Sequence, residues 1–229
     1  MIFMKRLIIA IDGPAGSGKS STAKLLAKKL GYNYIDTGAI YRCVTLHVLN
    51  NNIDVNNEEG IAKLLDTCNI EVSGDYFFLN DEDVTEKIRS KDVTYNVSKV
   101  CSYQVVRNKM VTMQRHLARN GGVILDGRDI GTVVFPNADV KFYLTANLEV
   151  RALRRYQENR IRGIDMSLEE VMQDIKRRDE KDSTRQISPL KKAEDAIELD
   201  TSRFSGVEKN VEAIIQILRN KQFEEKEIE

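Results

Sequence analysis

A glycine-rich loop near the start of the chain constrains the fold more than any other feature of the sequence. Residues 13–20 read GPAGSGKS and fit the pattern GxxxxGK[ST]. The run from Leu7 to Ile11 just before it is apolar throughout, as in a buried parallel strand. After the loop, apolar residues recur at helical spacing until Gly31. Strand, glycine loop and helix in this order predict a parallel α/β sheet that opens with a phosphate-binding P-loop.

Each residue type in this loop meets a requirement of phosphate binding. Glycines let backbone N–H groups turn toward phosphate oxygens, and the helix that follows adds its positive N-terminus. Lys19 is expected to reach the β- and γ-phosphates of ATP, and the Ser20 hydroxyl to coordinate Mg²⁺. The predicted ATP-binding residues of the loop are Gly13, Pro14, Ala15, Gly16, Ser17, Gly18, Lys19, Ser20 and Ser21.

The rest of the chain alternates segments with strand and helix patterns. Short apolar runs predict strands at 32–36, 123–125, 140–144 and 197–200. Amphipathic spacing predicts helices at 19–30, 41–49, 58–65, 104–120, 147–162, 167–181 and 207–218. Residues 69–85 differ, because short β-rich pieces separated by turn residues predict a small antiparallel hairpin or meander there. The alternation predicts a parallel sheet flanked by helices, with this β-rich segment as an insertion.

Asp126 is the second candidate metal ligand. It follows the all-apolar strand at 123–125, where a carboxylate would lie near the phosphate loop and join Ser20 in holding Mg²⁺. A switch GTPase would also carry an NKxD motif that reads guanine. The nearest match, residues 108–111, reads NKMV, lacks the aspartate and falls within a predicted helix. This difference favours a small-molecule kinase over a GTPase.

The overall composition narrows the partners. Lysine plus arginine and aspartate plus glutamate both number 35, so the chain has no basic excess of the kind that nucleic acid or an anionic membrane attracts. The three cysteines are scattered and form no CxxC pair, as is usual in a reducing compartment. No apolar run approaches the length of a signal peptide core or a membrane span. We therefore expect a cytoplasmic monomer with small-molecule partners.

Residues 151–163 hold five arginines and one acidic residue, Glu158. In a neutral chain this is a concentrated positive patch, and it is expected to form a lid over a triphosphate. Arg154 and Arg155 are the predicted ATP contacts of this lid. The alternative, a solvated basic helix face, remains open for each single arginine.

Three further blocks resemble the bacterial cytidylate kinases. They read DTGAIYR at 36–42, DGRDIGTVVFP at 126–136 and IKRRDEKDSTR at 175–185, and with the loop they span Ile8 to Ser202. The resemblance implies a P-loop fold of the nucleoside monophosphate kinase type. It also implies Mg²⁺-dependent transfer of the γ-phosphoryl group of ATP to CMP or dCMP. One domain is expected over 1–229, with a core (1–68, 95–150 and 193–229), an inserted monophosphate-binding subdomain (about 69–94) and an arginine-rich lid (about 151–192).

Site residues follow from the resemblance. Lys19, Arg128 and Arg185 are implied as catalytic groups, and Arg42 joins the two arginines in clamping the acceptor phosphate. Ser98, Arg107 and Asp129 are implied as cytosine readers, since a carboxylate suits the amino group of cytosine and opposes the carbonyl of uracil. Arg178 and Asp182 are implied at the sugar. The full expected substrate-binding set is Thr37, Tyr41, Arg42, Ser98, Arg107, Asp126, Gly127, Arg128, Asp129, Arg178, Asp182 and Arg185.

Other interpretations remain open from the sequence. Asp129 can simply pair with Arg128, Arg42 can be a surface charge of its helix, and Arg178 belongs to a basic run that is mostly solvated. A related kinase that acts on another nucleotide or a small alcohol shares most of these motifs. A nucleotide-binding regulator with no phosphate acceptor is the alternative from a different class. The proposed cytosine readers argue against the first, and the neutral charge and placement of the arginines against the second.

Overall fold

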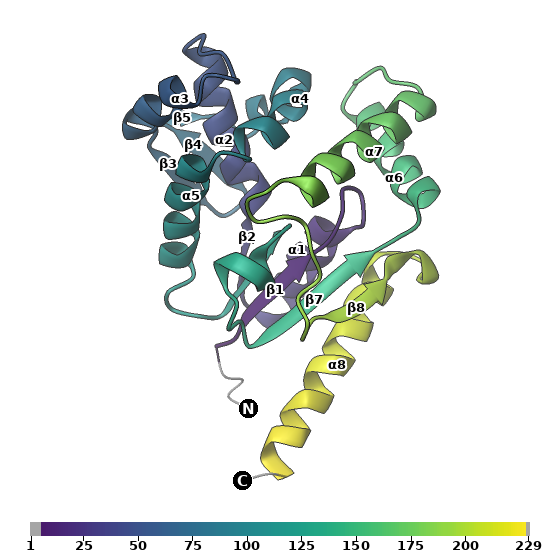
Figure 1. Cartoon of the computed structure of the whole chain (residues 1–229). Coiled ribbons are helices and arrows are strands. Elements are labelled where there is room, and N and C mark those ends of the chain that lie inside the picture. The colour runs from purple at the N-terminus through teal and green to yellow at the C-terminus, as the bar shows by residue number, and fades with distance from the viewer. Residues whose placement is uncertain (1–5, 228–229) are drawn as a thin grey trace.

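The computed structural model describes residues 6–227, so residues 1–5 and 228–229 of the expected domain lie outside the described part of the chain. Five parallel strands form the main sheet in the order β2-β6-β1-β7-β8 (Figure 1). Their bounds are β1 Ile8–Asp12, β2 Asn33–Asp36, β6 Val123–Gly127, β7 Val140–Thr145 and β8 Ile197–Asp200. The parallel sheet predicted from the sequence is confirmed.

Both faces of the sheet are covered by helices, since strand side chains alternate between them. Ile9 and Ile11 of β1 pack into one apolar cluster with α1 (Lys19–Leu30) and α8 (Val207–Glu227). Ala10 faces the opposite cluster, which holds apolar residues of α2 (Thr37–Asn50) and α5 (Gln104–Leu117). Because β1 is central and its neighbours run parallel to it, their carboxyl ends meet at one edge.

The antiparallel insertion expected at 69–85 is confirmed. It is a meander of three strands, β3 Ile70–Ser73, β4 Tyr76–Leu79 and β5 Glu82–Asp83. Phe77 and Leu79 belong to the same apolar cluster as α2, so this small sheet packs on that helix. The short helix α3 (Glu58–Leu64) leads into it, and Figure 1 shows these elements grouped beside α2.

Several helix boundaries differ from the predicted ones. Helix α2 begins at Thr37 instead of residue 41, because the Asp36 carboxylate caps it by accepting from the Ala39 N–H at 2.9 Å. Helix α5 ends at Leu117, and α8 continues beyond residue 218 to Glu227. Helix α4 (Lys91–Val100) was not predicted, since its sequence is rich in β-branched residues. Three short 3₁₀ turns (65–67, 87–89 and 201–203) and one π-helical turn, Ile130–Val134, complete the secondary structure.

Helices α6 (Leu148–Ile161) and α7 (Leu168–Thr184) pack against each other above the carboxyl edge of the sheet (Figure 1). They share a small apolar cluster of their own around Ala152, Val171 and Ile175. A capping box between Ser167 and Glu170 fixes the start of α7. Among the described helices, none combines the length and apolar character needed to cross a membrane.

Candidate active site

A cavity of about 480 Å³ lies at the carboxyl edge of the sheet, beneath α6 and α7. Most residues predicted from the sequence as site residues line it. They are Ala15, Gly16, Gly18, Lys19, Ser20, Ser21, Thr37, Tyr41, Arg42, Ser98, Asp126, Gly127, Arg128, Asp129, Arg154, Arg155, Arg178, Asp182 and Arg185. Gly13, Pro14, Ser17 and Arg107 are absent from its lining. Segments far apart in the sequence therefore converge on one cavity.

The phosphate loop wraps the amino end of α1. Gly13, Gly16 and Gly18 have φ of 147°, 74° and 83°, and a Cβ on Gly13 would lie 2.0 Å from the Leu144 carbonyl oxygen. Only glycine fits such a close backbone approach at positive φ. The buried Lys19 amine donates to the Pro14 carbonyl at 2.7 Å. Burial, and then the charge of Arg128, lower the pKa of Lys19 to about 7. A polyanion in the cavity would restore the pKa of this amine.

Three oxygen-bearing side chains meet beside the loop. Asp126 accepts a hydrogen bond from the Ser20 hydroxyl and another from the Tyr34 hydroxyl, each at 2.8 Å. Burial, and then the charge of Asp36, raise the pKa of Asp126 to about 6. In the described chain, no group of three or more histidine, cysteine and acidic side chains is arranged to hold a metal. Ser20 and Asp126 would suit a Mg²⁺ ion that takes its other ligands from phosphate oxygens and water.

Several arginines crowd the opposite wall of the cavity. Arg42 donates to the Ile88 carbonyl at 3.1 Å and to the Thr94 hydroxyl at 2.8 Å, so it is not a surface charge of α2. Burial, and then the charge of Arg178, lower the pKa of Arg42 to about 9. The Arg178 Nε is buried without a hydrogen-bond partner. Mutual repulsion and an unpaired donor mark a site that a phosphate dianion would stabilise.

Asp129 pairs with Arg107, and not with Arg128 as one interpretation of the sequence allowed. The Arg107 guanidinium donates to Asp129 Oδ2, and both side chains are almost fully buried. Arg185 approaches the other carboxylate oxygen, with its Nη2 3.5 Å from Asp129 Oδ1. Arg128 instead donates to Asp182 at 2.9 Å. Arg107 also lies 5.2 Å from the centre of the Tyr41 ring, which brings two expected substrate contacts together.

The arginines of the predicted lid are only partly directed at the cavity. Arg154 donates to the Thr201 hydroxyl and carbonyl at 2.8 and 2.9 Å, and Arg155 pairs with Glu158 at 3.3 Å. Both still line the cavity. Arg151 pairs with Asp179, whose other oxygen accepts from the Ala15 N–H at 3.1 Å. Helices α6 and α7 therefore contact the phosphate loop directly.

Comparison with known proteins decides the family. The cytidylate kinase family profile matches residues 9–220. A cytidylate kinase of Fusobacterium nucleatum is 51% identical over 218 residues, which cover 95% of this chain and 98% of that relative. The cytidylate kinase of Bacillus cytotoxicus is 50% identical over 217 residues, which cover 92% of this chain and 96% of that relative. That of Bacillus subtilis is 47% identical over 221 residues, which cover 95% of this chain and 98% of that relative.

The chain belongs to the cytidylate kinase family. The family resemblance inferred from the four sequence blocks is thereby confirmed, and so is the expectation of a kinase. The two broader alternatives, a nucleotide-binding regulator and a kinase of another family, are not supported. The role of each single site residue in this kinase remains a prediction.

Three residues that the sequence did not single out also bear on the site. Asp12 is the last residue of β1, much as Asp126 lies near the end of β6. The Asp12 carboxylate accepts from the Ile130 and Gly131 N–H groups. Tyr34 reaches Asp126 because β2 pairs with β6. Asp179 contacts the phosphate loop of the kinase. A strand-end position was the available signal for Asp12. Asp179 lies in the block at 175–185 but had no role assigned to it, and nothing in the sequence marked Tyr34.

Proposed function

We propose that this member of the cytidylate kinase family transfers the γ-phosphoryl group of ATP to CMP or dCMP, giving ADP and CDP or dCDP in pyrimidine nucleotide metabolism. The observation that carries the proposal is one cavity with a phosphate loop on one wall and a cluster of partly buried arginines on the other. Two polyanions can meet only if such charges offset their repulsion. Family membership supports the choice of acceptor.

On the donor side, the loop N–H groups and Lys19 would bind the β- and γ-phosphates of ATP. Ser20 and Asp126 would hold Mg²⁺, which neutralises charge on the phosphates as they react. Tyr34 fixes one oxygen of Asp126 and leaves the other facing Ser20. Arg154 and Arg155 of α6 would close over the triphosphate from above.

On the acceptor side, Arg42, Arg128 and Arg185 would bind the phosphate of CMP. This phosphate is already an anionic nucleophile, so no side chain is required to remove a proton. The reaction then depends on alignment and on stabilisation of charge in the transition state, which arginines held by hydrogen bonds and ion pairs provide. Arg178 and Asp182 would hold the sugar, and Thr37 and Tyr41 would complete the wall.

Base selection would rest on Ser98, Arg107 and Asp129. A carboxylate accepts from the 4-amino group of cytosine, while Arg107 and Ser98 supply donors for N3 and O2. Uracil would place a carbonyl oxygen against Asp129 and leave buried groups unpaired, which discriminates strongly. The ion pair between Arg107 and Asp129 supports this assignment, because it presets the orientation of both groups.

We also propose the division of the chain expected from the sequence, with a monophosphate-binding insertion at about 69–94 and a lid at about 151–192. Three free, buried cysteines, Cys43, Cys68 and Cys101, fit a reducing compartment, so we propose a cytoplasmic location. We propose a monomer, because the sequence contains no feature that requires a partner chain.

The decisive experiment measures ADP production from ATP and Mg²⁺ with CMP, dCMP, UMP, AMP, GMP or dTMP as single acceptors. Turnover with CMP and dCMP above the others is expected. In Asp129→Asn, an amide can donate to the 4-carbonyl of uracil, so the ratio of kcat/KM for CMP over UMP should fall at least about tenfold. Equal losses for CMP and UMP would contradict the reader role of Asp129, and turnover with another acceptor alone would reject the substrate assignment.

A further inference from the structure

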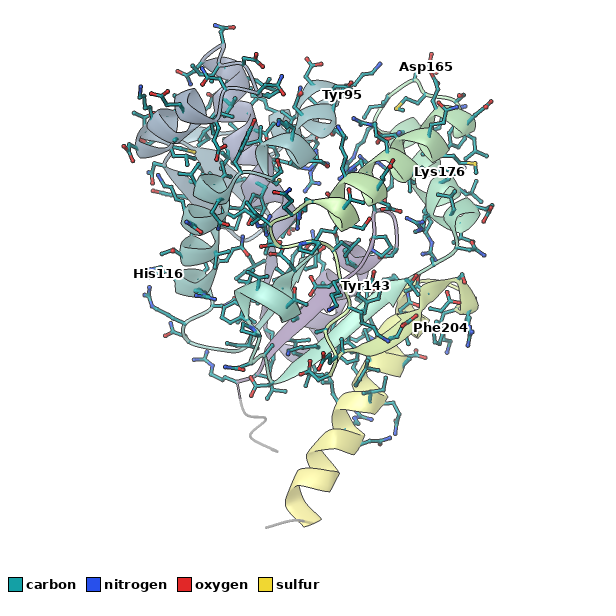
Figure 2. All side chains as sticks on the ribbon, viewed as in Figure 1. Tyr95, His116, Tyr143, Asp165, Lys176 and Phe204 are labelled. Atoms are coloured by element: carbon teal, nitrogen blue, oxygen red, sulfur yellow. The ribbon has the colours of Figure 1, made fainter. Side chains whose placement is uncertain are left out.

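Asp12 links the two halves of the cavity. It is the last residue of the central strand β1 and directly precedes Gly13 of the phosphate loop. Its neighbours across the sheet are Gly127 on β6 and Tyr143 on β7, the latter visible near the middle of the sheet in Figure 2. Its side chain is buried, with 4% exposed. A carboxylate in this position needs a specific reason, since burial of a charge is costly.

The partners of Asp12 supply that reason. Its Oδ1 accepts from the Ile130 N–H at 2.9 Å and its Oδ2 from the Gly131 N–H at 2.7 Å. These two residues begin the π-helical turn Ile130–Val134, and the first N–H groups of a helical turn have no partner within it. Asp12 thus caps this turn from 118 residues away in the sequence.

The capped turn immediately follows the residues expected to bind the acceptor. Asp129 flanks its first residue, and the Asp129 carbonyl accepts from Val133 N–H at 2.9 Å within it. Arg128 lies one residue earlier. Any movement of the turn would therefore shift Arg128 and Asp129 relative to Gly13, and a misplacement of about 1 Å can cost about a hundredfold in rate.

We propose that Asp12 is a positioning residue, which fixes the acceptor-binding residues Arg128 and Asp129 at a set distance from the phosphate loop. This inference rests on the proposed function, because it takes Asp129 and Arg128 as acceptor contacts. Asp12 touches neither substrate in this assignment, since it is absent from the cavity lining. Its negative charge also lies near Lys19 and raises the pKa of that amine against the larger effect of burial.

Asp12→Asn tests the idea, because an asparagine keeps the shape but offers one oxygen acceptor to two N–H groups. Loss of one hydrogen bond to a carboxylate should weaken CMP binding by about 10- to 100-fold in calorimetry, with ADP affinity changed less than about threefold. The ratio of kcat/KM for CMP over UMP should fall as well. Asp139→Asn is the matched control, since its carboxylate accepts from Ile8 N–H at 2.8 Å at the other end of β1, and it should change neither affinity.

A second variant moves the same turn without a substitution at Asp12. A Cβ on Gly131 would meet Lys141 Cδ at 3.0 Å and Asp12 Oδ2 at 3.4 Å, so Gly131→Ala should reproduce the selective loss of acceptor binding. This variant decides the question even if Asp12→Asn fails to fold. Equal loss of CMP and ADP binding, or no loss in both variants, would overturn the proposal. If the wild-type protein prefers another acceptor, the proposed function fails, and the same comparison on that acceptor still tests Asp12.

Discussion

The buried pair of Arg107 and Asp129 gives the sharpest test of the structure, because its loss affects stability as well as recognition. The side chains are 2% and 5% exposed. Asp129→Ala would leave the Arg107 guanidinium buried with only the Cys101 carbonyl, 3.2 Å away, as an acceptor. Breaking a buried pair from one side costs about 3–5 kcal/mol. For a chain of this size, that corresponds to a fall in Tm of about 6–20 °C.

The assay is urea unfolding followed by circular dichroism, without nucleotide because bound ligand would add its own stabilisation. The double variant Arg107→Met with Asp129→Ala removes both charges and should recover at least half of the lost free energy of unfolding. Glu198→Ala is the control, since the pair of Lys192 and Glu198 is about half exposed at 44% and 50% and should contribute at most about 1 kcal/mol. A loss below about 1 kcal/mol in Asp129→Ala, or additive losses in the double variant, would refute the reasoning.

Three further predictions follow from the donor side. Lys19→Ala should abolish phosphoryl transfer and leave the circular dichroism spectrum unchanged, because the Lys19 amine donates hydrogen bonds to Pro14 and Ser17 of its own loop. Near-normal turnover would reject the phosphate-loop assignment. Tyr34→Phe should raise the half-saturating Mg²⁺ concentration about tenfold by releasing one oxygen of Asp126, whereas the control Tyr32→Phe should not. Burial raises the pKa values of Asp12 and Asp126 to about 6, so the folded protein keeps protons that the unfolded chain loses above about pH 4. The free energy of unfolding should therefore decrease between pH 4 and 6 by up to about 1.4 kcal/mol per pH unit for each group, and Asp126→Asn should show a smaller slope.

Local motifs made much of the fold and site predictable. The phosphate loop is a contiguous pattern between a strand and a helix, and Asp126 lies near the end of a strand that an apolar run marks clearly. The block from Asp126 to Pro136 carried the family resemblance in the same way. Such features depend on neighbours in the chain, so a single sequence is enough to find them.

Contacts between distant segments could not be predicted. Arg107 and Asp129 are 22 residues apart, Arg128 and Asp182 are 54 apart, and in each case the partner is set by the packing of separate elements. Tyr34 contacts Asp126 because β2 pairs with β6, in a register that places Asp36 opposite Asp126. Helix α4 was missed because its valines and threonine favour strands locally, while burial of Val93, Val97 and Val100 against α2 stabilises the helix. Tertiary packing outweighed local propensity there.

Helix α7 connects the phosphate loop with a residue that we propose to bind the acceptor. Asp179 accepts from the Ala15 N–H of the loop, and Asp182, three residues later on the same face, pairs with Arg128. On the outer part of the helix, the Arg177 guanidinium lies 4.4 Å from the ring of Tyr95, which Figure 2 shows on α4 across from α7. A rigid helix cannot change its distance to the loop without also disturbing Arg128 and α4. In the proposed assignment, closure of α6 and α7 over ATP would therefore adjust the acceptor phosphate at the same time, which favours transfer only when both substrates are bound.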